Sequence, residues 1–188
     1  MKDDYLESMK KQFEYYKLLG EKTFAQLSDE QLFWQYNQES NSIAIIVKHL
    51  WGNMLSRWTD FLITDGEKEW RQRDDEFIND LATRKDLLEK WNDGWNCLLN
   101  TLASLTQDDM SKEIFIRNQG HSVVEAINRQ LAHYAYHVGQ IVFIGKMLRD
   151  QSWNSLSIPR GNSEIYNTEK FSKPPHKQHF TDDYLNKE

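Results

Sequence analysis

The sequence predicts an all-α protein in which residues 1–150 form an up-down four-helix bundle and residues 151–188 form an irregular C-terminal tail. Three observations favour this fold class. Four long segments carry apolar side chains every three or four residues, which is the period of a helix with one buried face. Several segments follow residues that cap helix N-termini. The three prolines are all C-terminal, so none forces an upstream helix to end: Pro159, Pro174 and Pro175.

The first long helix and a short second helix are separated by a serine suited to capping. The first is expected to run from about Leu6 and to continue loosely to Leu27, and its apolar stripe comprises Leu6, Met9, Phe13 and Tyr16. Ser28 and Gln31 then form a capping-box pattern. This pattern predicts a short helix that carries Leu32, Phe33 and Trp34.

The second long helix is expected to begin after Ser42, whose hydroxyl suits an N-cap, and to run to about Ile63. Its buried stripe consists of Ile43, Ile46, Val47, Leu50, Met54, Trp58 and Phe61. The charged segment 64–80 is interpreted as a connection with room for a short helical turn, anchored by Trp70 and Phe77.

The third long helix is expected over about residues 83–105, with a stripe of Leu87 or Leu88, Trp91, Trp95, Leu98 and Leu102. Residues 114–117 are interpreted as a short extended piece that ends in a turn and is too isolated to make a sheet. The capping box of Ser122 and Glu125 opens the fourth long helix, which continues to about Arg149. Two glycines inside this helix would permit a close helix crossing: Gly139 and Gly145.

Composition excludes several classes of function. The net charge is −6 with both signs interspersed, so no basic stripe exists to bind nucleic acid. The longest apolar run, near residues 43–47, is far too short to cross a bilayer, and the N-terminus leads into no signal-peptide region. A cytoplasmic location without membrane association is therefore expected. The single cysteine, Cys97, fits a reducing compartment and is expected to be a structural or partly exposed thiol.

Three histidines suggest a metal site. His133 and His137 are four residues apart on the fourth helix, so both imidazoles can face one ion. His49 lies at the edge of the apolar stripe of the second helix, where an unsatisfied imidazole would be costly to bury. Three protein ligands leave a coordination position for water or substrate, as in catalytic sites. A closed structural site, or boundary histidines without any metal, are the alternatives.

The ligand types narrow the metal chemistry. Tyr134 occupies the position of the glutamate in a His-Glu-x-x-His motif, which disfavours a thermolysin-like protease. The chain also lacks the Glu-x-x-His pairs of a ferritin-like di-iron site. An all-imidazole site suits Zn, Ni, Cu or Fe, whereas Mg and Ca prefer oxygen ligands.

Other polar residues near the histidines have weaker patterns. Asn53 and Gln140 follow His49 and His137 by about one turn and would orient imidazoles or bound water. Arg129 precedes His133 by one turn and would either attract an anionic substrate or form a surface ion pair. No general base stands out. The remaining histidines add little: His121 precedes a helix, and His176 and His179 lie in the polar tail.

The chain also resembles a known family. The histidine of the second helix, the His-x-x-x-His pair of the fourth and the strings at residues 42–62, 133–148 and 155–161 are similar to a Bacillus-type branch of the DinB-like (YfiT-type) superfamily of bacterial metal-binding proteins. The resemblance covers roughly residues 1–165. It implies one divalent metal, most often Zn or Ni, held by residues matching His49, His133 and His137. It also implies a homodimer and a small-molecule substrate.

The resemblance implies more than one function. Some relatives are enzymes that transfer or isomerise groups with a low-molecular-weight thiol such as bacillithiol, mycothiol or glutathione. In that case the metal would lower the pKa of the thiol and create a nucleophile at neutral pH. Others are described as metal-dependent hydrolases, in which the metal activates water. A thiol-dependent S-transferase is the preferred hypothesis, and a hydrolase or a non-catalytic, dimeric, stress-related metal-binding protein is the alternative.

Overall fold

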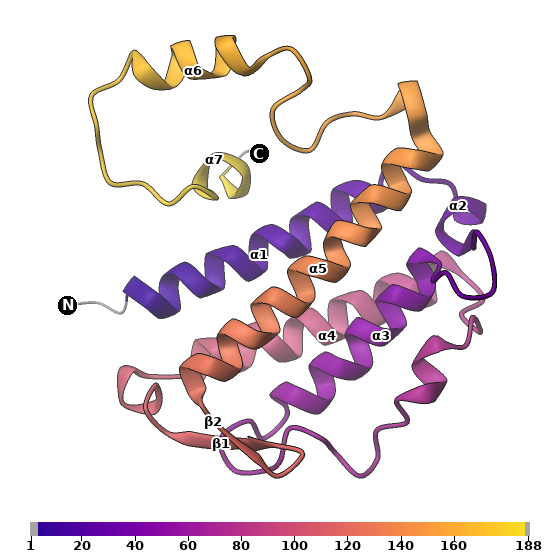
Figure 1. Cartoon of the computed structure of the whole chain (residues 1–188), viewed down its shortest axis with the longest axis vertical. Coiled ribbons are helices and arrows are strands. Elements are labelled where there is room, and N and C mark those ends of the chain that lie inside the picture. Colours follow the sequence, from indigo (N-terminus) through magenta and orange to yellow (C-terminus); the bar gives the residue numbers. More distant parts are fainter. Residues whose placement is uncertain (1–3, 187–188) are drawn as a thin grey trace.

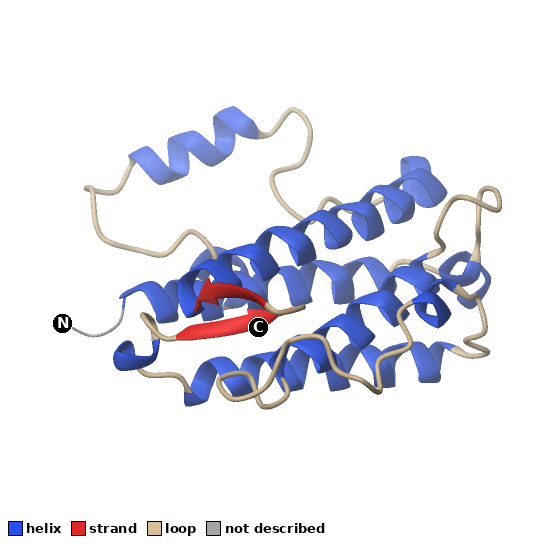
Figure 2. Ribbon diagram, turned by 60° about the horizontal axis from the view of Figure 1, so that its bottom comes forward, coloured by secondary structure: helices blue, strands red, loops and turns tan. Residues whose placement is uncertain are grey.

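Four long helices make up most of the protein and lie side by side (Figures 1 and 2). They are α1 (Asp4–Phe24), α3 (Ile43–Trp58), α4 (Arg84–Ser104) and α5 (Val123–Arg149). The structure, a computed structural model, describes residues 4–186. Helix α3 packs mainly against α4, and α1 packs mainly against α5, while α1–α4 and α3–α5 contacts close the arrangement. The prediction of a mostly helical protein is therefore confirmed.

The predicted helix starts are also confirmed. Ser28 and Gln31 form a capping box at the start of α2 (Asp29–Phe33). The side chain of Ser42 accepts a hydrogen bond from the backbone N–H of Ile45 at the start of α3. A capping box of Ser122 and Glu125 opens α5. Each serine side chain satisfies one of the N–H groups that lack a partner in the first helical turn.

The core between the long helices is built from aromatic rings. Phe13 of α1 contacts Trp58 of α3 and Trp95 of α4, with ring centroids 6.1 and 6.5 Å apart in edge-on geometry. Trp95 also contacts Tyr134 of α5 at 6.0 Å. Edge-on aromatic pairs contribute about 0.5–1.5 kcal/mol each beyond the burial of their area. One cluster thus joins all four long helices.

Two expectations for the segment after α3 need correction. The helix ends at Trp58 and not near Ile63, because Thr59 is extended and Asp60 adopts a positive φ of 49°. Ile63 is 82% exposed, so its side chain has no buried contacts that would favour extending the helix to this residue. The expected helical turn is present as the 3-10 helix η1 (Asp74–Phe77). Trp70 is 54% exposed and does not anchor this segment.

The expectation that residues 114–117 cannot make a sheet is wrong. Strand β1 (Glu113–Ile116) pairs in antiparallel register with β2 (Gln119–Ser122). Arg117 and Asn118 both have positive φ, as a two-residue hairpin turn requires. The side chains of Ile114 and Ile116 are buried against the helices, so the hairpin contributes to the core. Asp65 accepts hydrogen bonds from the backbone N–H groups of Arg117 and Asn118, each at 2.8 Å, and fixes the turn.

The C-terminal segment is less irregular than expected. It contains α6 (Ser163–Phe171) and α7 (Asp182–Leu185), with short 3-10 helices earlier in the chain at η2 (Gln107–Asp109) and η3 (Asp150–Ser152). In Figure 1, α6 stands apart from the long helices and α7 returns to α1. Lys11 of α1 pairs with Asp182 at 2.7 Å, and the hydroxyl of Ser8 lies 3.0 Å from His179 Nε2. Among the described residues, no helix is both long enough and apolar enough to span a membrane.

The two glycines of α5 should respond in opposite ways to alanine. A Cβ at Gly145 would lie 2.5 Å from Cγ2 of Thr23, so this glycine permits a close crossing with α1. A Cβ at Gly139 would meet nothing within 4 Å. We expect Gly145→Ala to lower the free energy of unfolding by about 1–3 kcal/mol through overpacking. Gly139→Ala should raise it by about 0.5–1 kcal/mol, because it removes backbone freedom from an exposed helical position. Urea unfolding of both variants checks this pair, and equal effects would contradict the close crossing.

Candidate metal centre

The structure brings the three predicted histidines together. His49 comes from the middle of α3, and His133 and His137 come from successive turns of α5. Nε2 of His133 lies 3.3 Å from Nε2 of His49 and 3.1 Å from Nε2 of His137. All three nitrogens lie within 4.8 Å of one another. The apolar spacing that predicted both helices therefore also places the three imidazoles at one point.

Two of the imidazoles are oriented through their other nitrogen. Nδ1 of His49 lies 2.8 Å from Oε2 of Glu76, and Nδ1 of His137 lies 2.8 Å from Oε1 of Gln140. An ionised carboxylate only accepts, so Nδ1 of His49 donates to Glu76 and, in the neutral ring that a metal binds, Nε2 carries the lone pair. The same tautomer is assigned to His137 by its amide partner. Outer partners of this kind are typical of histidines that ligate metals, and Gln140 has the contact that its spacing predicted.

Glu76 was not identified from the sequence. It belongs to η1, is only 4% exposed and receives a two-pronged contact from Arg71, whose Nε and Nη2 lie 2.8 and 3.0 Å from its carboxylate oxygens. The only sequence signal is Gly52, three residues after His49. A Cβ there would lie 2.3 Å from Oε1 of Glu76, so the glycine makes room for this carboxylate beside α3. Phe77, the predicted anchor of this segment, stacks on the ring of His49 at 4.9 Å.

Behind the histidines, a buried hydrogen-bond chain fixes the amide of Asn53. The indole N–H of Trp58 donates to the hydroxyl of Tyr134 at 3.0 Å, so this hydroxyl donates onward to Oδ1 of Asn53, also at 3.0 Å. An indole N–H can only donate, which determines the direction of the chain. The N–H2 group of Asn53 is then the end that remains for the pocket in front of the histidines. Asn53 therefore contacts Tyr134 and not an imidazole.

The donor set fits a divalent transition metal. Two nitrogens at the usual Zn–N length and a tetrahedral angle are about 3.3 Å apart, close to the separations of His133 from its two neighbours. Burial, with the neighbouring imidazoles, lowers the pKa of His133 to about 3, and burial lowers the pKa of His137. Both rings are thus neutral at pH 7, which is the form that binds a metal. Three imidazole nitrogens that face one another are a suitable donor set for a cation between them.

The histidines lie at a pocket of about 460 Å³ between α3, α5, the hairpin turn and η1. Its lining comprises His49, Asn53, Arg57, Arg71, Arg73, Phe77, Arg117, Arg129, Gln130, His133, Tyr136 and His137. Arg129, for which the sequence left two roles open, lies at this pocket with Nη1 3.1 Å from Nε2 of His121. The lining thus combines imidazoles with arginines, and none of the described residues in it carries a carboxylate.

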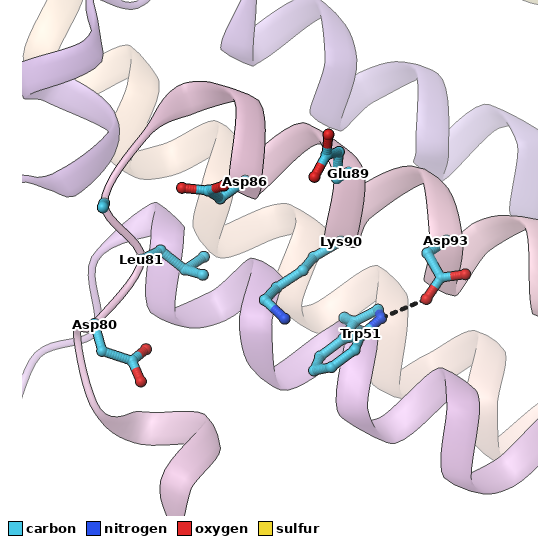
Figure 3. A pocket seen from close by; sticks show the side chains of 8 residues that line it. Trp51, Asp80, Leu81, Asp86, Glu89, Lys90 and Asp93 are labelled. Carbon is cyan, nitrogen blue, oxygen red and sulfur yellow. Dashed lines mark hydrogen bonds between the residues drawn. The ribbon is translucent and has the colours of Figure 1, made fainter.

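Another hollow of about 460 Å³ lies between α3 and α4 (Figure 3). Its charged groups are largely paired with their neighbours. The indole N–H of Trp51 donates to Asp93 at 2.7 Å, and the ammonium of Lys90 lies 3.4 Å from the centre of the same ring. Asp80 pairs with Lys48 at 2.5 Å. Because the two hollows have equal volume, the donor groups and not the size identify the histidine pocket as the candidate site.

The remaining residues considered from the sequence lie away from this centre. Nε2 of His179 faces Ser8, and the hydrogen bonds of His176 within the described residues go to its own tail segment. The thiol of Cys97 is half-buried 3.7 Å from the hydroxyl of Thr59, and burial raises its pKa. A thiol with a raised pKa is a poor nucleophile, in agreement with the structural role predicted for it.

The chain is mostly helical and holds three histidines in a partly buried cluster, and these two features define its class. The chain belongs to the family described as protein of unknown function (DUF1572), whose model matches residues 1–162. The match includes all three histidines and the arginines of the pocket. A comparison with curated proteins found no match.

The stability of the metal-free protein should depend on the protonation of His133. Its pKa in the folded protein, about 3, lies below its usual 6.5. Below about pH 6.5 the unfolded chain takes up a proton that the folded protein does not, so stability is full above this pH and falls as the pH decreases towards 3. For this one group the loss is up to about 1.4 kcal/mol per pH unit. Urea unfolding with a chelator at about pH 7.5 and pH 5 measures it. The same pH dependence in His133→Gln would contradict this assignment.

Proposed function

We propose that this protein is a metal-dependent thiol S-transferase that binds one divalent transition metal, Zn or Ni, through His49, His133 and His137. The convergence of three Nε2 atoms at an arginine-lined pocket carries the proposal. His133 and His137 remain partly exposed, so a ligand from solvent can reach the centre. Histidine Nε2 atoms are suitable ligands for either metal.

The proposal includes the finer fold class. We propose that α1, α3, α4 and α5 form an up-down four-helix bundle of the DinB-like type within residues 1–150, with residues 151–188 as an extension. The packing of neighbouring helices and the origin of the histidines from the second and fourth long helices support this class. In bundles, metal sites are built from inward side chains on facing helices. The proposed partner is a second copy of the chain. It would cover the exposed apolar residues of α5, Tyr136, Phe143 and Met147.

The residues around the centre have separable roles in this proposal. A bound metal would supply Lewis acidity, which lowers the pKa of a thiol so that a thiolate is available at neutral pH. Glu76 and Gln140 hold the imidazoles of His49 and His137 in their binding tautomers. Asn53 directs amide N–H groups towards the pocket. The arginines raise the positive potential, which favours an anionic nucleophile over its protonated form.

The lack of a general base favours thiol transfer over hydrolysis. A metal-dependent hydrolase of the thermolysin type uses a glutamate to take the proton of water. Glu76 is held by Arg71 and His49, and no carboxylate is among the residues that line the described pocket. The non-catalytic alternative requires a closed coordination sphere. Within residues 4–186 the potential ligand group contains three histidines and no fourth residue, which leaves a position for an exogenous ligand.

The proposal is tested with metal-loaded protein, a panel of low-molecular-weight thiols that includes glutathione and cysteine, and 1-chloro-2,4-dinitrobenzene. In the reaction the thiol loses its proton to the buffer, the sulfur–carbon bond forms, and the carbon–chlorine bond breaks as chloride leaves with the electron pair. We expect conjugation above the rate in buffer with at least one thiol, and its loss in His133→Ala. Conjugation equal to buffer for every thiol, together with metal-dependent ester hydrolysis, would support the hydrolase instead.

A further inference from the structure

The arginines of the pocket indicate what kind of molecule the site accepts. We propose that the pocket selects ligands that carry an anionic oxygen group, a carboxylate or a phosphate, and that Arg117 and Arg129 bind this group at the pocket mouth. The inference deepens the proposed function, because it takes the three-histidine centre as the place where the other end of the same ligand reacts. Binding of the anionic group itself requires only the arginines.

The first argument is the charge balance at the pocket. Five arginines line it, namely Arg57, Arg71, Arg73, Arg117 and Arg129. Three carboxylates pair with them: Glu67, Glu76 and Asp74. Five positive charges against these three negative charges leave a difference of two, and Asp65, whose carboxylate binds the backbone of the hairpin turn, reduces the local excess to one, in a chain whose net charge is −6. Such a local reversal of sign concentrates anions at the site.

The second argument is how the exposed arginines are held. Arg57 and Arg71 are buried and form ion pairs with Glu67 and Glu76, so they are not available to bind an anion at the pocket mouth. Arg129 is exposed, and its Nη1 lies 3.1 Å from the ring atom Nε2 of His121 rather than beside a carboxylate. Arg117 is exposed at the hairpin tip and shares Glu67 with two other arginines. Because Asp65 fixes the turn that carries Arg117, its guanidinium is presented to the pocket by a rigid backbone.

The third argument is an incomplete hydrogen-bond network between the histidines and the arginines. Gln130 lies one turn before His133, lines the pocket and is only 3% exposed, yet its Oε1 has no partner among the described residues. Nε of Arg57 is likewise buried without a partner there. Leaving such atoms unpaired costs about 1–3 kcal/mol each. Both side chains line the pocket. An anionic oxygen accepts hydrogen bonds, so it would pair with Nε of Arg57 and with the N–H2 group of Gln130 once these buried side chains turn towards it.

The test is calorimetric titration of metal-free protein with succinate, inorganic phosphate and the uncharged analogue succinamide. We expect succinate or phosphate to bind and succinamide not to bind, with weaker binding at high salt. The anion that binds more tightly shows whether the pocket prefers a carboxylate or a phosphate. Arg117→Gln/Arg129→Gln should weaken that binding at least about tenfold, since it removes two charge-assisted contacts. Arg160→Gln, which changes the same charge in an exposed loop away from the pocket, is the control for a single charge.

Two results would overturn the proposal. One is equal or absent binding of all three probes, and the other is an effect of Arg160→Gln as large as that of the double variant. The same titration in metal-free His133→Ala separates the two proposals, because anion binding should persist there even when thiol transfer is lost. Gln130→Leu gives an independent readout. It should weaken anion binding several-fold without lowering the free energy of unfolding. If Gln130 were only structural, the substitution would lower the free energy of unfolding and leave anion binding unchanged.

Discussion

Replacing His133 with alanine should lower the affinity for Zn or Ni by more than about 100-fold. Loss of an outer partner of a ligand already costs about 10–100-fold, and loss of a ligand should cost more. His133 is the central member of the cluster, since both short Nε2–Nε2 separations involve it. Removing it leaves His49 and His137, which come from different helices and form no i, i+4 pair.

Equilibrium dialysis followed by elemental mass spectrometry measures this affinity. His176→Ala is the matched control, because that ring is exposed in the C-terminal segment and its hydrogen-bond partners among the described residues are Pro174 and Gln178. The control should bind one metal per chain like the unaltered protein. Equal metal content in His133→Ala and His176→Ala would mean that the histidine cluster does not bind the ion.

Replacing Glu76 with alanine should have the largest effect on stability. The carboxylate of Glu76 holds the buried guanidinium of Arg71 and orients His49. Removal of one partner of a buried ion pair leaves an uncompensated charge and costs about 3–5 kcal/mol. Arg71 has a second partner, Glu67 at 3.3 Å, which would still compensate part of its charge. The expected loss of stability is therefore near the lower end of this range. The affinity for the metal should also fall by about 10–100-fold, because His49 loses the group that fixes its tautomer.

Two further variants separate the effects on stability and on metal binding. Arg71→Met/Glu76→Leu removes both charges, so it should recover much of the stability while metal binding stays weak. Gly52→Ala places a Cβ 2.3 Å from Oε1 of Glu76 and should displace the carboxylate without removing it. Glu69→Ala, at an exposed position of the same segment, is the control. Urea unfolding that shows equal stability for Glu76→Ala and Glu69→Ala would contradict the role of the buried pair.

The parts of the site that could be predicted are those fixed by local spacing. Two residues four apart lie on the same face of any α-helix, so the pairing of His133 with His137 could be predicted without knowing the fold. His49 could be placed because its helix has a long apolar stripe. The helix starts at Ser28, Ser42 and Ser122 depend only on residues within one turn. Gln140 was accessible in the same way, since it lies three residues after its partner.

The remaining parts depend on contacts between distant segments. Glu76 lies 27 residues after His49 in a charged segment without periodicity, and its pairing with Arg71 and His49 makes its burial possible. The hairpin was missed because the turn residues Arg117 and Asn118 lack the glycine that usually marks such a turn. Tyr134 was considered only as the residue that replaces the glutamate of a His-Glu-x-x-His motif, but its buried hydroxyl orients Asn53. The arginines of the pocket come from four separate segments and share no sequence pattern.

X-ray absorption spectroscopy of the Zn- or Ni-loaded protein tests most directly whether three histidines hold one metal with a position left for a ligand. The result that we predict is three imidazole nitrogens, at about 2.0–2.1 Å for Zn, with at least one further light atom that is not imidazole. The imidazole signal should be absent from His133→Ala. A metal surrounded only by oxygen atoms, or a closed set of four protein ligands, would contradict the account.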